Sequence, residues 1–210
     1  MRVRTEAKRA AIVSAAQAAF LEAGFERASM AEIAARAATS KVTLYSYFPS
    51  KEALFVEATL EHRRPQFEPA FLALEAPGAE LRPALLRFAE AVLQVTCSED
   101  FIAARRTVIG ESAHSDIGRL YFEVGPKVGE QRIGAWLGKQ IRAGRLRRTD
   151  TRVATRHLLA LIEAETFYAN LMGVRRGTSR ADIRRYAERA VDVFLRAYGK
   201  DSAKDGGAGK

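Results

Sequence analysis

Residues 29–51 read SMAEIAARAATSKVTLYSYFPSK, and this stretch decides the fold of the first part of the chain. Ser29 and Glu32 match a capping box, in which the serine side chain accepts a hydrogen bond from the third backbone N–H of a helix and the glutamate reaches back to the cap N–H. The pattern predicts a helix that begins at about Met30. The segment Ala38-Thr39-Ser40 then ends it, because threonine and serine favour caps over helix interiors.

A second, short helix is predicted from about Lys41 to Phe48. Leu44 and Phe48 are four residues apart, so their side chains can pack inward together. The rest of the helix surface is rich in hydroxyl groups, which suit a phosphate backbone and base edges better than a protein core. The spacing alone leaves two interpretations open, a DNA-binding helix-turn-helix and an ordinary helical hairpin with exposed tyrosines. The outward residues are Lys41, Val42, Thr43, Tyr45, Ser46 and Tyr47.

From Thr39 to Leu54 the chain reads TSKVTLYSYFPSKEAL, which resembles the TetR family of bacterial transcriptional regulators, whose usual pattern is close to V-S-K-G-T-L-Y-x-Y-F-x-S-K-E-x-L. Three positions depart from that pattern. Ala38 stands where glycine is usual, Thr39 replaces valine, and Val42 replaces glycine or proline. An alanine in a turn that requires a positive φ costs roughly 1 kcal/mol, so the turn is expected to be looser but still to form.

The resemblance implies a helix-turn-helix that binds double-stranded DNA. Its positions at base edges or the adjacent sugar-phosphate correspond to Lys41, Val42, Thr43 and Tyr45. Its phosphate-holding positions correspond to Ser29, Met30, Tyr47 and Lys51. Because valine offers only apolar contact, for example to a thymine methyl group, Val42 is expected to alter sequence preference rather than affinity.

The composition is that of an ordinary globular protein, with 210 residues, of which 48% are hydrophobic and 28% are charged. The single cysteine, Cys97, excludes an intramolecular disulfide. No apolar run approaches the roughly 20 residues that a membrane helix needs, and the first ten residues, MRVRTEAKRA, lack the apolar core of a signal peptide. We therefore expect a cytoplasmic protein.

The net charge of +9 and the pI near 10.0 favour a polyanionic partner. Residues 1–51 hold eight bases and four acids, a net charge of +4. Arg2 and Arg4 form a basic arm that either reaches into a minor groove or frays without a role. Two later clusters are interpreted as solvated helix ends and loops in preference to a second nucleic-acid surface. They are Arg142, Arg145, Arg147, Arg148 and Arg152, and Arg175, Arg176, Arg180, Arg184 and Arg185.

Helical periodicity and turn residues predict an all-α chain, and the resemblance implies that residues 1–51 form a three-helix helix-turn-helix domain for DNA binding. Its first helix is expected to span about residues 8–23 and to stop at Gly24. Ser50 can cap a linker helix that runs to about residue 64 and ends before Pro65.

Residues 65–199 are expected to form a larger helical domain, to which the resemblance assigns ligand binding and dimerisation, and residues 200–210 are expected to form a disordered tail. Two amphipathic helices end this domain. The first is capped by Thr149 or Asp150 and runs to about Met172, and the second is capped by Thr178 or Ser179 and runs to Tyr198. They can close the monomer core or pair with a second copy in a four-helix bundle. The resemblance implies the second arrangement, a homodimer through the last two helices.

Two further segments, RRTVIGESAHSDIGRLYFEVGP at 105–126 and GRLRRTD at 144–150, resemble the C-terminal half of the AefR-like branch of the family. The resemblance implies a small-molecule pocket in the second domain. Its candidate lining consists of aromatic and polar residues on otherwise apolar helix faces, with core packing as the alternative role for most of them. They are Phe101, Arg105, Tyr121, Phe122, Trp136, His157, Glu163, Phe167 and Tyr168.

Enzyme chemistry is not expected, nor is a catalytic residue, a metal or a cofactor. His62, His114 and His157 stand without a second ligand at metal spacing, and Ser112 lacks a G-x-S-x-G context. Together with the resemblance, the sequence predicts a ligand-responsive repressor that binds a palindromic operator as a homodimer and is released by a small-molecule effector. The alternatives are an activator or dual regulator of the same family, and a helical adaptor that binds no DNA.

Overall fold

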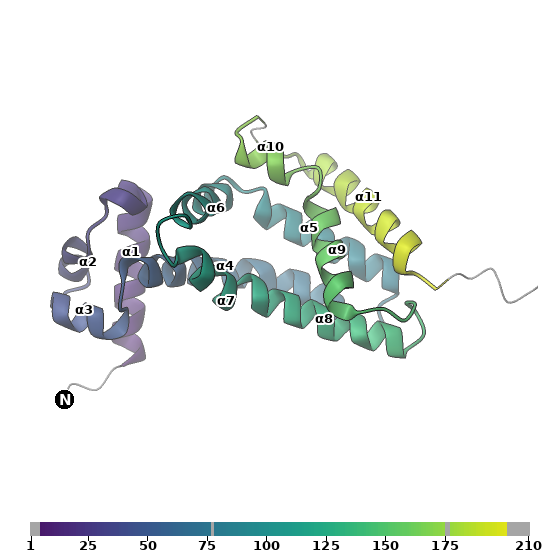
Figure 1. Ribbon diagram of the computed structural model, residues 1–210, viewed down its shortest axis with the longest axis horizontal. Coiled ribbons are helices and arrows are strands. Elements are labelled where there is room, and N and C mark those ends of the chain that lie inside the picture. The colour runs from purple at the N-terminus through teal and green to yellow at the C-terminus, as the bar shows by residue number, and fades with distance from the viewer. Residues whose placement is uncertain (1–4, 77, 175–176, 201–210) are drawn as a thin grey trace, which may run out of the picture. The chain divides into compact units, whose positions relative to one another are not determined.

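The computed structural model describes residues 5–76, 78–174 and 177–200. Within these ranges the chain forms helices and one isolated β-bridge, between Leu146 and Gly199, so the predicted all-α class is confirmed (Figure 1). The basic arm with Arg2 and Arg4, the pair Arg175 and Arg176, and the tail from residue 201 lie outside the described residues. The helices are α1 (Glu6–Arg27), α2 (Met30–Arg36), α3 (Lys41–Tyr47), α4 (Lys51–Glu75), α5 (Leu81–Thr96), α6 (Glu99–Glu111), α7 (Ile117–Val124), α8 (Pro126–Arg142), α9 (Thr151–Glu163), α10 (Phe167–Leu171) and α11 (Arg180–Tyr198).

Side-chain caps begin the first three helices. Thr5, Ser29 and Ser40 each accept a hydrogen bond from the backbone N–H three residues further on, at the starts of α1, α2 and α3. Gly24 has a φ of 78°, which breaks the helical path near the end of α1, as the sequence predicts. The apolar faces of the three helices meet in a core that includes Ile12, Ala16, Ile33, Leu44 and Phe48.

The turn between α2 and α3 is built on Ala38, the one non-glycine residue of the described ranges with a positive φ, 46°. The N–H of Thr39 donates to the carbonyl of Ala34 at 3.0 Å, and the ammonium group of Lys8 donates to the carbonyl of Ala38 at 3.2 Å. The turn therefore adopts the left-handed conformation that suits glycine, and contacts from α1 and α2 hold an alanine there.

The fourth helix does not end before Pro65, so that prediction is wrong. Helix α4 continues through Pro65 and Pro69 to Glu75. Each proline removes one helical N–H donor, yet both prolines are exposed and so is Glu61, whose carbonyl loses its partner to Pro65; water can reach these groups. Hydrogen bonds from α8 hold the part of α4 that follows the prolines.

The described residues divide into two compact units. One contains the residues up to Pro65 together with Ala103–Pro126, and the other contains Gln66–Ile102 together with the residues from Lys127 onward. Residues 103–126 therefore group with the first unit and not with the second domain, where the sequence placed them. The physical reason is a second apolar cluster in that unit, formed by Phe25, Phe55, Val56, Leu60, Val108 and Ile117.

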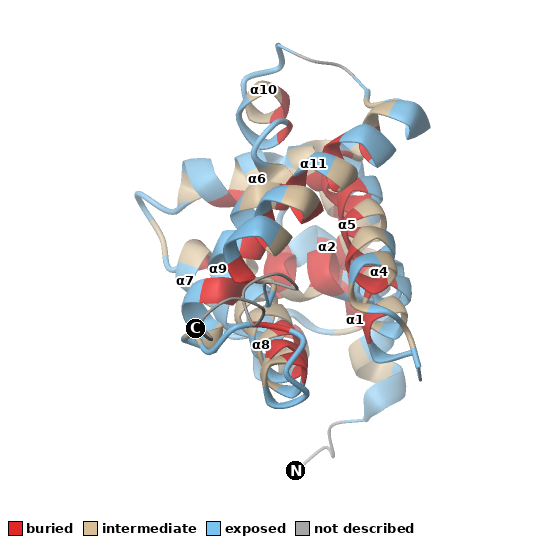
Figure 2. Ribbon diagram, turned by 90° about the vertical axis from the view of Figure 1, so that its right-hand side faces the viewer, coloured by how far each residue is buried: buried red, intermediate tan, exposed pale blue. Residues whose placement is uncertain are grey.

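The second unit has its own core. Helix α11 packs along α5 and beside α9, and Figure 2 colours the buried residues of these helices. The predicted run from Asp150 to Met172 is interrupted, because α9 ends at Glu163 and α10 begins after Thr166. No helix of the described ranges is long and apolar enough to cross a membrane. The largest fully buried side chains of this core include Phe88, Leu93, Leu137, Leu158, Ile162 and Phe194.

The strain at Ala38 can be measured by substitution. We expect Ala38→Gly to raise the free energy of unfolding by about 1 kcal/mol, because glycine adopts a positive φ without a Cβ clash. The neighbouring Ala37, at a φ of −79°, supplies the matched control. Ala37→Gly should lower the free energy by about 0.5–1 kcal/mol. Chemical denaturation of both variants checks this, and a loss of stability in Ala38→Gly would contradict the strain.

Candidate nucleic-acid interface

Helix α3 is held in the first unit by two side chains on one face. Leu44 is fully buried and Phe48 is 5% exposed. The guanidinium of Arg9 lies 5.6 Å from the centre of the Phe48 ring and pairs with Glu57 at 2.7 Å, so the charge above Phe48 is neutralised. These contacts fix the rotation of α3 about its axis and leave its opposite face to solvent.

The solvent face of α3 carries most of the residues that the sequence assigned to base edges. Val42 is 82% exposed and Tyr45 is 41% exposed. Lys41 is exposed as well, with its ammonium group 6.0 Å from the centre of the Tyr45 ring. Thr43 is half-buried, and its hydroxyl lies 2.8 Å from that of Ser40, which caps the helix. The structure thus brings these four residues onto one short helix, with the Thr43 hydroxyl oriented by the cap.

Tyr47 ties α3 to the start of α1. Its hydroxyl accepts a hydrogen bond from the backbone N–H of Thr5 at 2.8 Å, and Thr5 is the cap of α1. Lys8, one turn further along α1, reaches the turn at Ala38. The start of α1 is therefore hydrogen-bonded to both ends of the segment from Ala38 to Tyr47. Tyr47 thus helps to position α3, in addition to its predicted phosphate contact.

Lys51 lies at the start of α4 and faces α1. Its ammonium group donates to the carbonyl of Glu26 at 2.8 Å and lies 4.6 Å from the centre of the Phe25 ring. The cation therefore stabilises the end of α1, where carbonyl groups lack helical partners. Its predicted phosphate contact requires the ammonium group to share its hydrogen atoms between that carbonyl and DNA.

The start of α2 forms only half of the predicted capping box. Ser29 accepts from the N–H of Glu32 at 3.1 Å, but the Glu32 carboxylate pairs with Arg36 at 2.6 Å instead of reaching back to the cap. Arg36 also pairs with Glu22 at 2.8 Å, and this contact lowers the pKa of Glu22 below its ordinary value. The predicted hydrogen bond from the cap N–H to the Glu32 carboxylate does not form, because Arg36, one turn away, is the stronger partner for a carboxylate. Ser29 is exposed, and the side chain of Met30 is buried.

Among the nine residues proposed for an effector pocket, Trp136, Phe101 and His157 contact other residues of the chain. The indole N–H of Trp136 donates to the carbonyl of Leu74 at 2.6 Å, and Phe101 packs edge-to-face on Phe67. His157 is exposed and its Nδ1 lies 2.5 Å from the hydroxyl of Tyr198, so it is not a buried polar group in search of a partner. Phe122, Phe167 and Tyr168 are 40%, 40% and 71% exposed, whereas Arg105, Tyr121 and Glu163 are half-buried.

Two buried hydroxyl groups without a hydrogen-bond partner in the described part of the chain were missed by reasoning from sequence, those of Thr96 and Thr178. Thr96 lies at the end of α5. An unsatisfied buried hydroxyl is costly and marks a place where a bound molecule can supply the missing partner. The signal for Thr96 in the sequence is a hydroxyl directly after the apolar stripe Val92, Leu93 and Val95.

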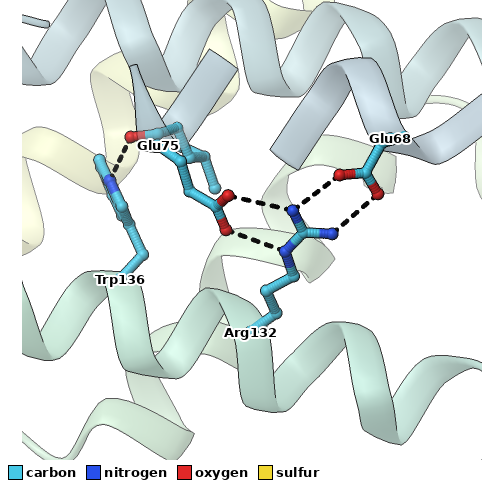
Figure 3. Close-up of polar contacts among 5 residues, drawn as sticks. Glu68, Glu75, Arg132 and Trp136 are labelled. Carbon is cyan, nitrogen blue, oxygen red and sulfur yellow. Dashed lines mark hydrogen bonds and ion pairs between the residues drawn. The ribbon is translucent and has the colours of Figure 1, made fainter. Parts of the chain in front are cut away.

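In the second unit, α8 holds the last two turns of α4 through a single arginine (Figure 3). The guanidinium of Arg132 makes two hydrogen bonds to Glu68, each of 2.9 Å, and two to Glu75, of 2.9 and 3.1 Å. It also lies 4.2 Å from the centre of the Phe71 ring, between the two glutamates. Together with the bond from Trp136 to Leu74, this contact explains why α4 continues past its prolines.

A three-helix head with an outward-facing third helix, followed by a larger helical unit, defines a transcriptional regulator of the helix-turn-helix class. Residues 12–58 match the model of bacterial regulatory proteins of the tetR family, and residues 83–200 match that of the C-terminal domain of AefR-like transcriptional repressors. The chain therefore belongs to the TetR family. Regulators of this family bind DNA, typically form dimers and have small-molecule ligands, and they are not enzymes.

Solved structures agree with this assignment. A TetR-family regulator from Mesorhizobium loti MAFF303099 is 26% identical, with a TM-score of 0.80 over 95% of this chain and 100% of that chain. The flavonoid-responsive regulator FrrA is 28% identical, with a TM-score of 0.74 over 94% and 100%. A TetR-family regulator from Pseudomonas syringae pv. tomato str. DC3000 is 30% identical, with a TM-score of 0.67 over 94% and 100%. No curated protein matches the sequence.

The Arg132 contact predicts a pH dependence. Its hydrogen bonds hold the pKa of Glu68 and of Glu75 below the ordinary value of 4.5. A carboxylate with a lowered folded-state pKa contributes stability that is present above about pH 5 and is lost as the pH falls through the folded-state pKa. We expect the melting temperature of the natural protein to fall more steeply from about pH 5 to about pH 3 than that of Arg132→Gln.

Arg156→Gln is the control for this comparison, because it removes one longer contact, 3.6 Å to Glu130, on the same helix bundle. Circular dichroism at each pH gives the melting temperatures. Parallel declines in all three proteins would contradict a stabilising role of the Arg132 pairs.

Proposed function

We propose that this protein is a ligand-responsive repressor that binds a palindromic operator as a homodimer and leaves it when a small-molecule effector binds. The observation that carries the proposal is the outward face of α3, where Lys41, Val42 and Tyr45 are exposed while Leu44 and Phe48 are buried. A helix held in this way can enter a major groove and present its side chains to base edges. The match to the AefR-like repressor domain supports repression over activation.

The four residues assigned to base edges have different roles in this proposal. Lys41 and Tyr45 offer hydrogen-bond donors to bases or to the sugar-phosphate, and the Thr43 hydroxyl is oriented by Ser40. Val42 offers only a methyl surface, which suits a thymine methyl group. Ser29, Tyr47, Lys51 and the first backbone N–H groups of α2, at Met30, hold phosphates on either side.

Effector binding belongs to the second unit in this proposal. The unpartnered hydroxyl of Thr96 supports a polar contact for the effector at the end of α5. Phe101, which follows five residues later in the sequence, is buried. His157 is a weaker candidate than the sequence suggested, because Tyr198 already satisfies it. The effector can release DNA only to the extent that it binds the released state more tightly than the DNA-bound state.

Selection of binding sites from a pool of random DNA tests the proposed function. We expect inverted repeats to be enriched, with half-sites about one helical turn apart, because a two-fold dimer presents two copies of α3. Enrichment of single half-sites, or no enrichment of any sequence, would contradict the proposal that a homodimer binds a palindromic operator.

Two substitutions separate base reading from backbone contact. Thr43→Ala should lose discrimination at one or two base pairs, worth about 1–3 kcal/mol at each, while keeping its affinity for random DNA. Lys51→Ala should weaken binding to all sequences and reduce the salt slope by about 1. Because Lys51 also holds Glu26, thermal melting must accompany the measurement, with the exposed Arg27→Ala as the control of equal charge. Equal losses on operator and random DNA for Thr43→Ala and Lys51→Ala would contradict the division.

The dimer is proposed to form through the last two long helices. Val153 on α9 and Val193 on α11 are 44% and 47% exposed. We expect Val153→Glu and Val193→Glu together to shift sedimentation equilibrium towards the monomer, because they place charge in an apolar contact. Val128→Glu is the control, since Val128 is 54% exposed on α8. If the control dissociates the dimer and the double variant does not, the interface lies elsewhere.

A further inference from the structure

The densest positive charge of the described chain lies outside the helix-turn-helix. Residues 139–152, KQIRAGRLRRTDTR, hold six basic side chains and one acid, a net charge of +5 within 14 residues. We call this segment, which joins the end of α8 to the start of α9, the arginine loop. The sequence alone favours solvated helix ends and loops for these cations, but the contacts of the loop support a binding surface.

The arginine loop has a defined backbone. Gly144 turns the chain with a φ of 69°, and Leu146 is buried and forms the β-bridge with Gly199. The N–H of Arg147 donates to the carbonyl of Tyr198 at 2.9 Å. The loop is thus fastened to the end of α11, and its arginine side chains project from a fixed framework.

The arginines of the arginine loop form no ion pair with a carboxylate of the described residues, whereas, beside the hydrogen bonds from Arg132, the charge of Lys139 helps to lower the pKa of Glu75. Arg145 donates to the carbonyl of Ala79 and to the side-chain oxygen of Gln140, both at 3.3 Å, and both acceptors are neutral. The Arg147 guanidinium lies 5.1 Å from the centre of the Tyr198 ring. The only acid of the loop, Asp150, accepts from backbone N–H groups at the start of α9.

Other arginines of the same unit behave differently. Arg82 pairs with Asp192 at 2.8 Å, Arg132 pairs with two glutamates, and Arg189 pairs with Glu165. Carboxylates are therefore available in this unit, yet none of the described ones forms an ion pair with an arginine of the arginine loop. The loop leaves exposed the side chains of Lys139, Arg142, Arg145, Arg147, Arg148 and Arg152.

The chemistry of the arginine loop favours phosphates of a duplex. Five of its six cations are guanidinium groups, whose planar donors match phosphate oxygens. Its two large apolar residues are Ile141, which is half-buried, and Leu146, which is buried, and Tyr198 beneath Arg147 is buried too. Membrane-surface binding uses exposed apolar side chains, and single-strand binding uses exposed aromatic rings for stacking. The surface lacks both among its described residues.

We propose that the arginine loop is a second DNA-binding surface, which contacts the phosphate backbone of double-stranded DNA without reading its sequence. This surface requires no contact from α3 and goes beyond the proposed reading of an operator. It would add affinity for any duplex, and that contribution would fall steeply with salt because each neutralised phosphate releases counterions.

The test compares two triple variants of equal charge. Arg142→Gln, Arg148→Gln and Arg152→Gln together remove three loop cations that make no described side-chain contact with an acid. Arg87→Gln, Arg180→Gln and Arg196→Gln remove three exposed arginines elsewhere in the second unit. Fluorescence anisotropy with a short random-sequence duplex, from about 50 to about 200 mM KCl, gives the slope of log affinity against log salt. Thermal melting confirms that both variants fold.

We expect the loop variant to lower the magnitude of the slope by about 2–3, close to 0.9 for each lost phosphate contact, and the control to lower it by less than 1. If the salt slope changed equally in both variants, the net charge of the protein would account for the effect, and the proposal would be overturned. No change in the loop variant would also overturn it. The proposal would also be overturned if only the loop variant lost binding to phosphatidylglycerol vesicles while its salt slope for duplex binding stayed unchanged.

The same comparison in a Lys41→Ala, Tyr45→Ala background keeps this proposal separate from operator reading. The difference between loop and control variants should persist there, because it does not depend on α3. If random-pool selection fails while this difference remains, the proposed repressor function is wrong and the second surface stands. If the difference disappears in this background, the arginine loop does not bind DNA by itself.

Discussion

The burial of Leu44 and Phe48 is the constraint on which the rest of the candidate interface depends. Helix α3 has seven residues, too few to be stable alone in water. It forms because these two side chains fill the core made by α1 and α2. Their burial fixes the direction of every other side chain on α3, so the exposure of Val42 and Tyr45 follows from it.

Cations serve two different purposes in this protein. In the first unit, Arg9, Arg36 and Lys51 bind a carboxylate or a carbonyl of the chain itself, so much of the positive charge there holds the fold together. In the second unit, Arg132 does the same for α4, whereas the arginine loop keeps its charges unpaired within the described residues. Net charge alone therefore gives a poor guide to where a polyanion binds.

Local signals were readable from the sequence, and long-range ones were not. The caps Ser29 and Ser40 depend on residues three positions away, and both form. Of the two predicted caps Thr149 and Asp150, the second one forms. The contacts that Tyr47 and Lys51 make with α1 join residues 42 and 25 positions apart, which periodicity does not reveal.

The same distinction explains the errors. Two prolines are a sound local reason to end α4, but the contact with Arg132, more than 50 residues later, carries the helix past them. The outward set on α3 was predictable because it follows from the four-residue spacing of two apolar side chains.

The most direct measurement of DNA reading by α3 is a hydroxyl-radical footprint on a duplex selected by the protein. Two protected patches, related by two-fold symmetry and about 10 base pairs apart, should appear with the natural protein and vanish with Lys41→Ala, Tyr45→Ala. A single or uniform protection that this double variant leaves unchanged would contradict the account of α3 as the helix that reads DNA.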